Sequence, residues 1–463
     1  MIATDTDSLG LDRLLSSGLL RRARKGLGGS HTVVTYPPLE ALQHLDDPSV
    51  VEAAIGPCES LNLYVHIAFC EFICAFCHYT KMRSDIDAES SLISAYLDAV
   101  GRELEMRRSA LAGATVDSLY IGGGTPTVLP TAALISLIER FSGLTGGSAR
   151  RICVESSPLT LHAPTGRVKL AALVAAGVDR ISVGVQTFDD ELLRNHRGHS
   201  AAELTAALTY LRGRVQTLNI DLIQDLPGQT SASIMADIDW VQEFRPEQVT
   251  WYILRTGAGS SWHKSGRVCA PDMPSDFESG RRRLDIIDGM ESIGYRSCGG
   301  GRFVLGTGSN DYYKAVRHAA AKSLLGFGAS AYSHGWGWFF RNSRPGGAKS
   351  VIRDYIDAVA ADRSPIGVGR RLSEDDCATA TLSSAIRDVL PADSFSGDTA
   401  DAQRVSSLVD RLIACGAAYR DAEAGIRLTR YGRAFEEEIV SLFYGRAIRN
   451  ELASRGLLWA APG

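Results

Sequence analysis

Six apolar, strand-like stretches recur along the first 254 residues, and a helical pattern or a longer connection separates each from the next. The strand-like stretches are 61–67, 117–123, 151–156, 180–186, 217–223 and 248–254, and the helical patterns include 95–111, 131–141, 169–177 and 231–244. Such alternation predicts βαβ units, whose strands lie parallel in one sheet. The strands are apolar nearly throughout, as is typical of sheets covered on both faces. The pattern does not decide between a doubly wound sheet and an incomplete barrel.

Ligands gather at the C-terminal ends of parallel strands in either architecture. The chemically notable residues of this chain fall at that end. Three cysteines follow the first strand, three glycines end the second, Glu155 lies in the third, Gln186 ends the fourth and Asp221 lies in the fifth. We therefore expect one site at this edge of the sheet.

The alternation stops after about residue 270. Residues 335–347 are rich in glycine and aromatic side chains and are predicted to be a loop or a substrate-facing segment. Residues 404–442 have the pattern helix, short hairpin, helix, which resembles a winged-helix module. We interpret it as a lid or packing element without DNA contact, because the chain has no basic stripe. The predicted domains are an N-terminal extension (1–58), a barrel (59–270) and a mostly helical substrate or lid domain (271–463).

Composition narrows the class of protein. The net charge is −4, with Lys and Arg scattered, so no nucleic-acid partner is expected. No stretch approaches the roughly 18 apolar residues that span a bilayer, and the N-terminus has acidic residues where a secretory signal has basic ones. We expect a cytoplasmic protein without membrane contact. In that compartment nine cysteines argue against a disulfide framework, and a local cluster of them indicates metal or redox chemistry.

Cys70, Cys74 and Cys77 form such a cluster, with the spacing C-x3-C-x2-C. A structural zinc site takes four ligands, and the adjacent His78 is poorly placed to be the fourth. Iron–sulfur clusters are held by thiolates, usually four, so three cysteines would leave one iron open for a substrate or cofactor. The apolar neighbours Phe69, Phe72, Ile73 and Phe76 would keep water away. Three ligands therefore favour an iron–sulfur cluster with a vacant iron.

The cluster and five further motifs resemble radical S-adenosylmethionine (SAM) enzymes of the oxygen-independent coproporphyrinogen III oxidase-like family. The motifs are "YVHIAFC", "YIGGGTPT", "GVDRISVGVQTFDDELLR", "NIDLIQDLPGQT", "LLGFGASAYS" and "GIRLTRYGR", in the family's order, from about Tyr64 to Tyr444. The resemblance implies a partial (βα)6 barrel followed by a mostly helical C-terminal domain. It also implies a 4Fe-4S cluster whose open iron binds SAM, and reductive cleavage of SAM to methionine and a 5′-deoxyadenosyl radical. An electron donor such as flavodoxin or ferredoxin and a monomeric enzyme are expected with it.

The resemblance also assigns roles to individual residues. Cys70, Cys74 and Cys77 would hold the cluster, and Tyr64 matches the family tyrosine near the sulfonium, where it would contribute to catalysis. The remaining SAM contacts would come from Gly122, Gly123, Gly124, Thr125, Glu155, Gln186, Arg197 and Asp221. An internal salt bridge is an equal interpretation of Asp221, and Arg194 is an alternative to Arg197 because the segment is one residue short of the family pattern. His66 is interpreted first as a strand-interior residue.

The family contains several reactions. Coproporphyrinogen oxidases typically carry another cysteine two residues after the third, where this chain has Tyr79, and haem chaperones generally lack an extension like residues 1–58. "CHYTK" is closest to the class C methyltransferases and cyclopropanases, which use two SAM molecules to add a methyl or methylene group to an sp2 carbon. The leading prediction is therefore such an enzyme acting on a natural product. The alternatives are oxidative decarboxylation by a coproporphyrinogen III oxidase and a haem chaperone.

Overall fold

The computed structural model describes most of the chain. The described residues are 5–21, 36–55, 60–83, 90–143, 151–162, 164–196, 199–254, 260, 262, 273–307, 323–395, 400–422 and 425–455. All structural statements below concern these residues.

Six neighbouring parallel strands form the centre of the molecule, as the sequence predicts. They are β2 (Ser60–Ile67), β5 (Thr115–Gly123), β6 (Ile152–Ser156), β7 (Arg180–Gln186), β8 (Thr217–Gln224) and β9 (Gln248–Ile253), in that order across the sheet. Each pairs in parallel with the next. The sheet curves into a partial barrel, which confirms the predicted α/β fold class and decides between the two architectures.

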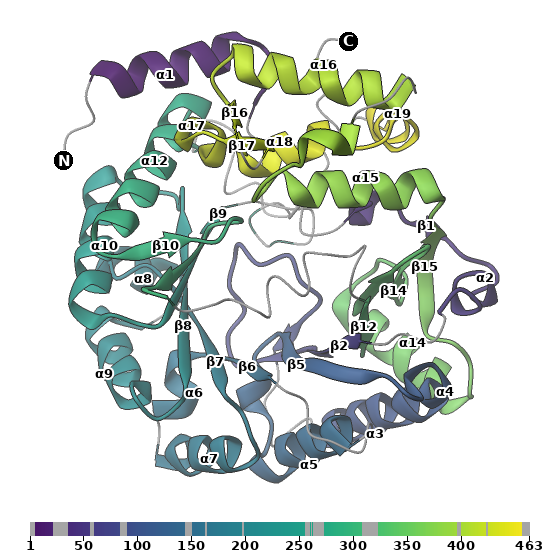
Figure 1. Cartoon of the computed structure of the whole chain (residues 1–463). Helices are drawn as coiled ribbons and strands as arrows, with labels where there is room; N and C mark the ends of the chain where they lie inside the picture. The colour runs from purple at the N-terminus through teal and green to yellow at the C-terminus, as the bar shows by residue number, and fades with distance from the viewer. Residues whose placement is uncertain are drawn as a thin grey trace.

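Helices cover the outer side of the curved sheet (Figure 1). They are α3 (Ser90–Met106), α4 (Arg108–Leu111), α5 (Thr131–Ser142), α6 (Pro158–His162), α7 (Pro164–Ala175), α8 (Asp190–His196), α9 (Ala201–Leu211), α10 (Ser231–Phe244) and α12 (Asp276–Ser292). Their apolar faces and the outward side chains of the strands form one large buried core, from Val51 to Ile366. Capping boxes at Ser200, Thr230 and Ser275 start α9, α10 and α12, because each side chain accepts from an otherwise unpaired backbone N–H.

Further strands extend the sheet on both sides. β12 (Ser323–Phe327) runs parallel to β2, and β13 (Tyr332–Gly335), β14 (Trp338–Asn342), β15 (Ile366–Arg371) and β1 (Gln43–His44) follow it in antiparallel order. β11 (Arg302–Leu305) and β10 (Tyr295–Ser297) extend the other side, beyond β9. The prediction of a loop over residues 335–347 is therefore wrong for Trp338–Asn342, which form β14, while residues 343–347 do lie outside strands and helices. Trp338, Phe339 and Phe340 are buried, and their strand forms a hairpin with β13 inside the sheet.

The C-terminal helices pack around a second apolar core. The elements are α14 (Ala348–Ala360), α15 (Glu374–Ala385), α16 (Ala400–Ala414), β16 (Ala418–Asp421), β17 (Gly425–Leu428), α17 (Arg430–Ala434), α18 (Glu436–Leu442) and α19 (Arg446–Ser454). Those from α15 onward share this core with Leu11 and Leu14 of α1 (Asp5–Ser16). α16, the β16–β17 hairpin, α17 and α18 confirm the predicted order of helix, hairpin and helix. Its identity as a winged helix stays a prediction, as do the three domain boundaries.

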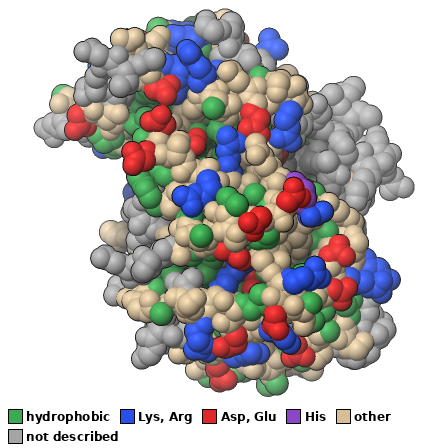
Figure 2. Space-filling view, turned by 90° about the vertical axis from the view of Figure 1, so that its right-hand side faces the viewer, with side chains coloured by type: hydrophobic (Ala, Val, Ile, Leu, Met, Phe, Trp, Pro, Cys, Tyr) green, Lys and Arg blue, Asp and Glu red, His purple; other side chains and the backbone are tan. Residues whose placement is uncertain are grey.

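Charged side chains of both signs are interspersed on the face seen in Figure 2, and no single-sign stripe crosses it. Within the described part of the chain, no helix is both long enough and apolar enough to cross a membrane.

Candidate active site

One cleft opens at the C-terminal ends of the parallel strands, where the sequence places the site. Its volume is about 360 Å³. The side chains that line it include Tyr64, Cys70, Phe72, Cys74, Cys77, Tyr79, Lys81, Tyr120, Gly123, Gly124, Thr125, Glu155, Arg180, Gln186, Asp221, Tyr252, Arg302, Tyr332 and Glu437. We call it the central cleft. It brings together all of the predicted site residues except Gly122, which lies in β5 beside it, and Arg197, which is outside the described residues.

The cysteine segment follows β2 directly and is held at both ends. Phe69 and Cys70 form the short strand β3 (Phe69–Cys70), which pairs with β4 (Met82–Arg83). Between them the chain turns, with the Cys77 N–H donating to the Cys74 carbonyl at 3.2 Å, and Lys81 Nζ donates to the Cys77 carbonyl. None of the three thiols is in a disulfide, and all three line the same cleft.

The donor set fits an iron–sulfur cluster better than a single metal ion. Among the described residues, no three His, Cys, Asp or Glu side chains lie close enough to hold one ion. In a cluster each thiolate binds a different iron, so its ligands stand farther apart. Burial raises the pKa of the Cys70 thiol to about 12, and burial also raises the pKa of Cys77. A bound metal centre would supply the positive charge that these buried thiolates need.

The glycine segment of β5 packs against the start of the cysteine segment. Gly124 N–H donates to the Ile67 carbonyl at 2.7 Å, and Thr125 N–H donates to the Phe69 carbonyl at 2.8 Å. A Cβ on Gly124 would lie 2.4 Å from the Phe69 carbonyl oxygen, and one on Gly123 would lie 2.4 Å from Nδ1 of His66. Gly123 also has φ of +107°, which favours glycine. Side chains at these two positions would therefore displace the wall of the cleft.

Glu155 is fixed at the same place by two donors. Its Oε1 accepts from the Tyr120 hydroxyl at 2.6 Å, and its Oε2 accepts from the Gly123 N–H at 2.9 Å. Burial raises the pKa of Glu155, and these two hydrogen bonds oppose that effect. A partly buried carboxylate of β6 that is fixed beside the glycine segment is suited to bind the positively charged amino group of a ligand.

Gln186 is a cleft residue with a strained backbone. It ends β7, where the register against β8 shifts. Its φ is +71°, a conformation that is disfavoured for residues with a Cβ. Its side chain is buried, and Oε1 has no hydrogen-bond partner. Strain and an unsatisfied buried acceptor together indicate a group kept for a ligand. This observation supports a polar ligand in the cleft.

Asp221 lies deeper in the barrel and is part of a hydrogen-bond network. Its carboxylate accepts from Ser182 Oγ at 3.1 Å and from Asn219 Nδ2 at 2.9 Å. Burial raises its pKa, and the nearby positive charge of Arg180 opposes the rise. Asp221 therefore has internal hydrogen-bond partners, but within the described part of the chain it forms no ion pair, so the internal salt bridge is not found, and Asp221 also lines the cleft.

Arg194 does not take the place predicted as an alternative to Arg197. It lies on α8 with 62% of its side chain exposed, and it pairs with Asp190 at 2.8 Å. It is not among the residues that line the central cleft.

His66 is a residue whose role the sequence interpretation underestimated. Its Nε2 lies 2.9 Å from the Thr80 carbonyl, which can only accept, so Nε2 carries the proton. Nδ1 is then an acceptor, and the Tyr64 hydroxyl donates to it at 2.8 Å. Burial lowers the pKa of His66 to about 4, which keeps the ring neutral. His66 thus orients Tyr64 and also ties down the segment after the cluster.

Aromatic side chains from distant parts of the chain form the remaining wall of the cleft. Tyr332 of β13 stacks on Tyr64 with ring centroids 6.1 Å apart. Tyr252 of β9 lines the cleft as well, and Phe72 and Tyr79 keep 44% and 47% of their surface exposed there. Sequence reasoning missed Tyr252 and Tyr332. The only signal was their position at the C-terminal end of a strand or just after a glycine-rich motif.

Comparison with known proteins agrees with the site. Residues 64–241 match the model of the Radical SAM superfamily. The heme chaperone HemW of Haemophilus influenzae is 30% identical over 240 residues, which are 49% of this chain and 60% of HemW. The oxygen-independent coproporphyrinogen III oxidase of Paracoccus denitrificans is 27% identical over 416 residues, which are 85% of this chain and 88% of that enzyme.

A solved structure is similar along nearly its whole length. The coproporphyrinogen III oxidase HemN from Escherichia coli, described as a radical SAM enzyme, superposes with a TM-score of 0.72 and 25% sequence identity. The match covers 89% of this chain and 96% of that one. These relatives favour the oxidase alternative and give no support to the methyltransferase branch that the sequence placed first. Proteins of that superfamily use a 4Fe-4S cluster and SAM as cofactors. The chain is thus similar to the radical SAM superfamily over residues 64–241, and to the coproporphyrinogen III oxidases over most of its length.

Proposed function

We propose that this radical SAM enzyme takes a hydrogen atom from an organic substrate in the central cleft, and that its reaction is the oxidative decarboxylation of a coproporphyrinogen-type propionate. The observation that carries the proposal is the convergence of Cys70, Cys74 and Cys77, a glycine wall and the strained Gln186 on one cleft. The reaction is taken from the oxidase that resembles 85% of the chain.

The chain's own residues have three tasks in such a reaction. Cys70, Cys74 and Cys77 would hold the cluster, and Gly123 with Glu155 would hold the aminoacyl end of SAM. When bound, the reduced cluster and SAM supply a 5′-deoxyadenosyl radical. Tyr64, held by His66, would keep the sulfonium in place, and the aromatic wall would exclude water. Loss of a hydrogen atom to that radical, of carbon dioxide, and of one electron to an external one-electron acceptor would convert a propionate into a vinyl group.

Methyl or methylene transfer with two SAM molecules is the second candidate. Tyr79 favours it, because the oxidases typically carry a cysteine at this position. Its ring lies in the central cleft with 47% of its surface exposed, so it would contact whatever binds there. The substrate would then be a small molecule with an sp2 carbon.

One anaerobic assay distinguishes an oxidase from a transferase and from a chaperone. Reconstituted protein is given SAM and dithionite, with and without coproporphyrinogen III. We expect 5′-deoxyadenosine together with decarboxylated porphyrinogen. S-adenosylhomocysteine formed alongside 5′-deoxyadenosine, with no porphyrinogen consumed, would favour the transferase. Stoichiometric haem transfer with little SAM cleavage would instead indicate a chaperone like HemW.

An electron donor such as flavodoxin or ferredoxin and a monomeric state belong to the same proposal. Replacement of dithionite by reduced flavodoxin in that assay, and size-exclusion chromatography with light scattering, test them.

A further inference from the structure

Arg302 lines the central cleft from a strand outside the six predicted ones. It begins β11 and stands opposite Thr250 of β9. Cross-strand partners project from the same face of a sheet, and both residues line the cleft. Burial raises the pKa of the Tyr252 and Tyr332 hydroxyls, and the positive charge of Arg302 opposes the rise at both. The guanidinium therefore lies near both aromatic residues of the cleft wall.

Three glycines in succession place Arg302 there. Gly299, Gly300 and Gly301 have φ of +77°, +59° and +73°. Residues with a Cβ are disfavoured in this conformation by about 1–2 kcal/mol each. A Cβ on Gly301 would also lie 2.3 Å from the Trp251 carbonyl oxygen, while the Gly301 carbonyl accepts from the Trp251 N–H at 2.7 Å. The glycine turn lets β11 pack this close to β9, because a Cβ at Gly301 would collide with the Trp251 carbonyl.

Contacts from two other elements hold the turn. Gly300 N–H donates to Glu436 Oε1 of α18 at 2.7 Å, and Arg387 pairs with the same carboxylate. On the other side, Arg283 of α12 donates to the Trp251 carbonyl at 2.7 Å. The turn is therefore linked directly to the C-terminal helices and, through Trp251 of β9, to α12.

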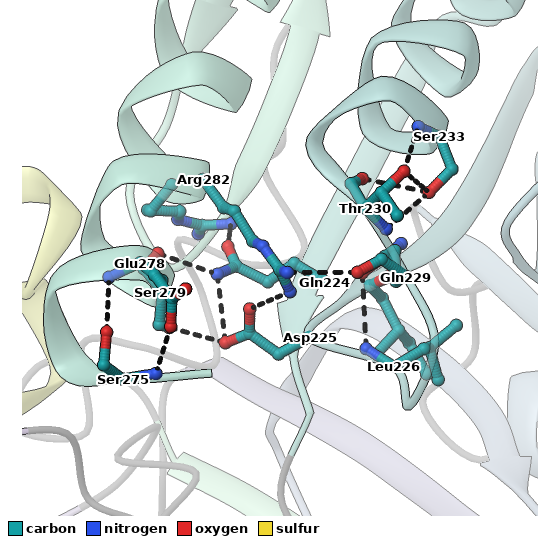
Figure 3. A network of polar contacts seen from close by, with 12 residues as sticks. Gln224, Asp225, Leu226, Gln229, Thr230, Ser233, Ser275, Glu278, Ser279 and Arg282 are labelled. Atoms are coloured by element: carbon teal, nitrogen blue, oxygen red, sulfur yellow. Dashed lines mark hydrogen bonds and ion pairs between the residues drawn. The ribbon is translucent and has the colours of Figure 1, made fainter. Parts of the chain in front are cut away.

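α12 is itself fixed to the end of β8 by the network shown in Figure 3. Asp225, in a left-handed conformation with φ of +67°, accepts from Ser279 Oγ at 2.5 Å and pairs with Arg282 at 3.3 Å. Gln224 donates to the Ser279 carbonyl at 3.2 Å. Buried networks of this kind hold an element in one position.

The three cations of the described cleft lining have different surroundings. Lys81 donates to the Cys77 carbonyl, and Arg180 donates to Gln248 Oε1 at 2.9 Å and to Cys153 Sγ at 2.9 Å. Both serve the walls of the barrel. Arg302 Nη1 donates to the Gly300 carbonyl of its own turn at 3.0 Å, which ties the guanidinium to that turn. Glu437 of α18 is an acidic residue that lines the same cleft.

We propose that Arg302 binds a carboxylate of the substrate and so decides which molecules enter the central cleft. The inference rests on the proposed function for the identity of that substrate. A guanidinium binds a planar carboxylate with two parallel hydrogen bonds, and a fixed guanidinium loses little freedom on binding. The aminoacyl carboxylate of SAM has the same chemistry, so the test includes it.

The test measures binding to anaerobically reconstituted protein without reductant. Coproporphyrin III, its tetramethyl ester and SAM are titrated against the wild type, Arg302→Gln, Arg302→Lys and Glu437→Gln. Arg296→Gln is the matched control, since Arg296 lies on the adjoining strand β10 and is not a cleft residue. Iron content and thermal unfolding show that each variant keeps its fold.

We expect Arg302→Gln to weaken coproporphyrin III roughly 10- to 100-fold, the loss expected for one charged hydrogen-bonded contact. The ester and SAM should bind as before, Arg302→Lys should restore part of the affinity, and Glu437→Gln should strengthen binding of the acid. A loss confined to SAM would move the carboxylate to SAM and overturn the substrate assignment. The proposal is overturned entirely if Arg302→Gln binds both coproporphyrin III and SAM as tightly as the wild type does. It is also overturned if the wild type binds no porphyrin and Arg302→Gln leaves the SAM affinity unchanged. Normal porphyrin binding without turnover would contradict the proposed function and leave the role of Arg302 standing.

Discussion

The Tyr64 hydroxyl donates to Nδ1 of His66 at 2.8 Å, and Nε2 of the same ring donates to the Thr80 carbonyl at 2.9 Å. One neutral imidazole therefore links a side chain of the cleft floor to the backbone three residues after Cys77. The cluster segment and the tyrosine keep a fixed relation to each other because they share this ring.

This link predicts different results for its two ends. His66→Ala removes both hydrogen bonds, so we expect a reconstituted protein with much less iron and weak absorbance near roughly 400 nm. Tyr64→Phe leaves the His66–Thr80 bond in place, so iron should stay at the wild-type level while kcat/KM falls several-fold, as for one lost hydrogen bond. Equal iron in the two variants would show that His66 does not hold the segment.

Each cluster cysteine should be required separately. Cys70→Ser, Cys74→Ser and Cys77→Ser are each expected to lose most of the iron and all SAM cleavage, because serine does not replace a thiolate toward iron. Cys377→Ser is the control, since Cys377 lies on α15 and lines no part of the central cleft. Iron and sulfide analysis after anaerobic reconstitution measures this. A single cysteine variant with full iron content would remove that residue from the ligand set.

The glycine wall should not accept a side chain. Gly123→Ala would place a Cβ 2.4 Å from His66 Nδ1 at a φ of +107°, so we expect SAM affinity to fall at least about tenfold, with loss of stability. Gly143→Ala is the matched control, because its φ is −77° and nothing lies within 4 Å of its Cβ position. Isothermal titration with SAM compares them. Equal affinities would mean that the wall yields without effect on the site.

The strained backbone of Gln186 is expected to lower the stability of the protein, while its side-chain amide is expected to strengthen SAM binding. Gln186→Ala removes the unsatisfied acceptor, and we expect SAM affinity to fall up to about tenfold. Gln186→Gly should bind SAM as weakly but unfold with about 1 kcal/mol more free energy than the alanine variant, because glycine accepts the φ of +71°. Urea unfolding and SAM titration give the two quantities. Tight SAM binding by both variants would contradict a ligand role for the amide.

Stability should depend on pH through Asp237 of α10, which holds the segment that follows Gln186. Asp237 accepts from the Phe188 N–H at 2.6 Å and from the Thr187 hydroxyl, and burial raises its pKa to about 7. A raised carboxyl pKa means that the folded protein holds this proton more tightly than the unfolded chain. The contribution is fully present below about pH 4 and is lost as the pH rises through about 7.

Asp237→Asn should flatten this part of the profile, measured as the urea midpoint of the apoprotein between pH 4 and pH 8. Asp239→Asn, on the exposed side of the same helix, should keep the wild-type slope. A slope unchanged by Asp237→Asn would assign the pH dependence to other groups.

The sequence predicts the parallel half of the fold well because each strand and helix carries its own local period. It also predicts the cleft, since residues at the C-terminal ends of parallel strands must meet. The β13–β14 hairpin escapes prediction because Trp338, Phe339 and Phe340 are all apolar, so the strand shows no alternation. Tyr332 and Arg302 escape for another reason, which is strand pairing between distant parts of the sequence. The strand of Tyr332 is joined to the barrel by the pairing of β12 with β2, and the strand of Arg302 by the pairing of β11 with β9.

The neighbours of β2 and β9 have a consequence for dissection of the chain. β12 covers the outer edge of β2, and β11 covers that of β9. A fragment that ends near residue 270 would expose both edges as rows of unpaired N–H and C=O groups, which are templates for intermolecular pairing. This barrel fragment is therefore expected to aggregate when it is produced alone. Aggregation should be avoided only when residues 295–342 are produced with it.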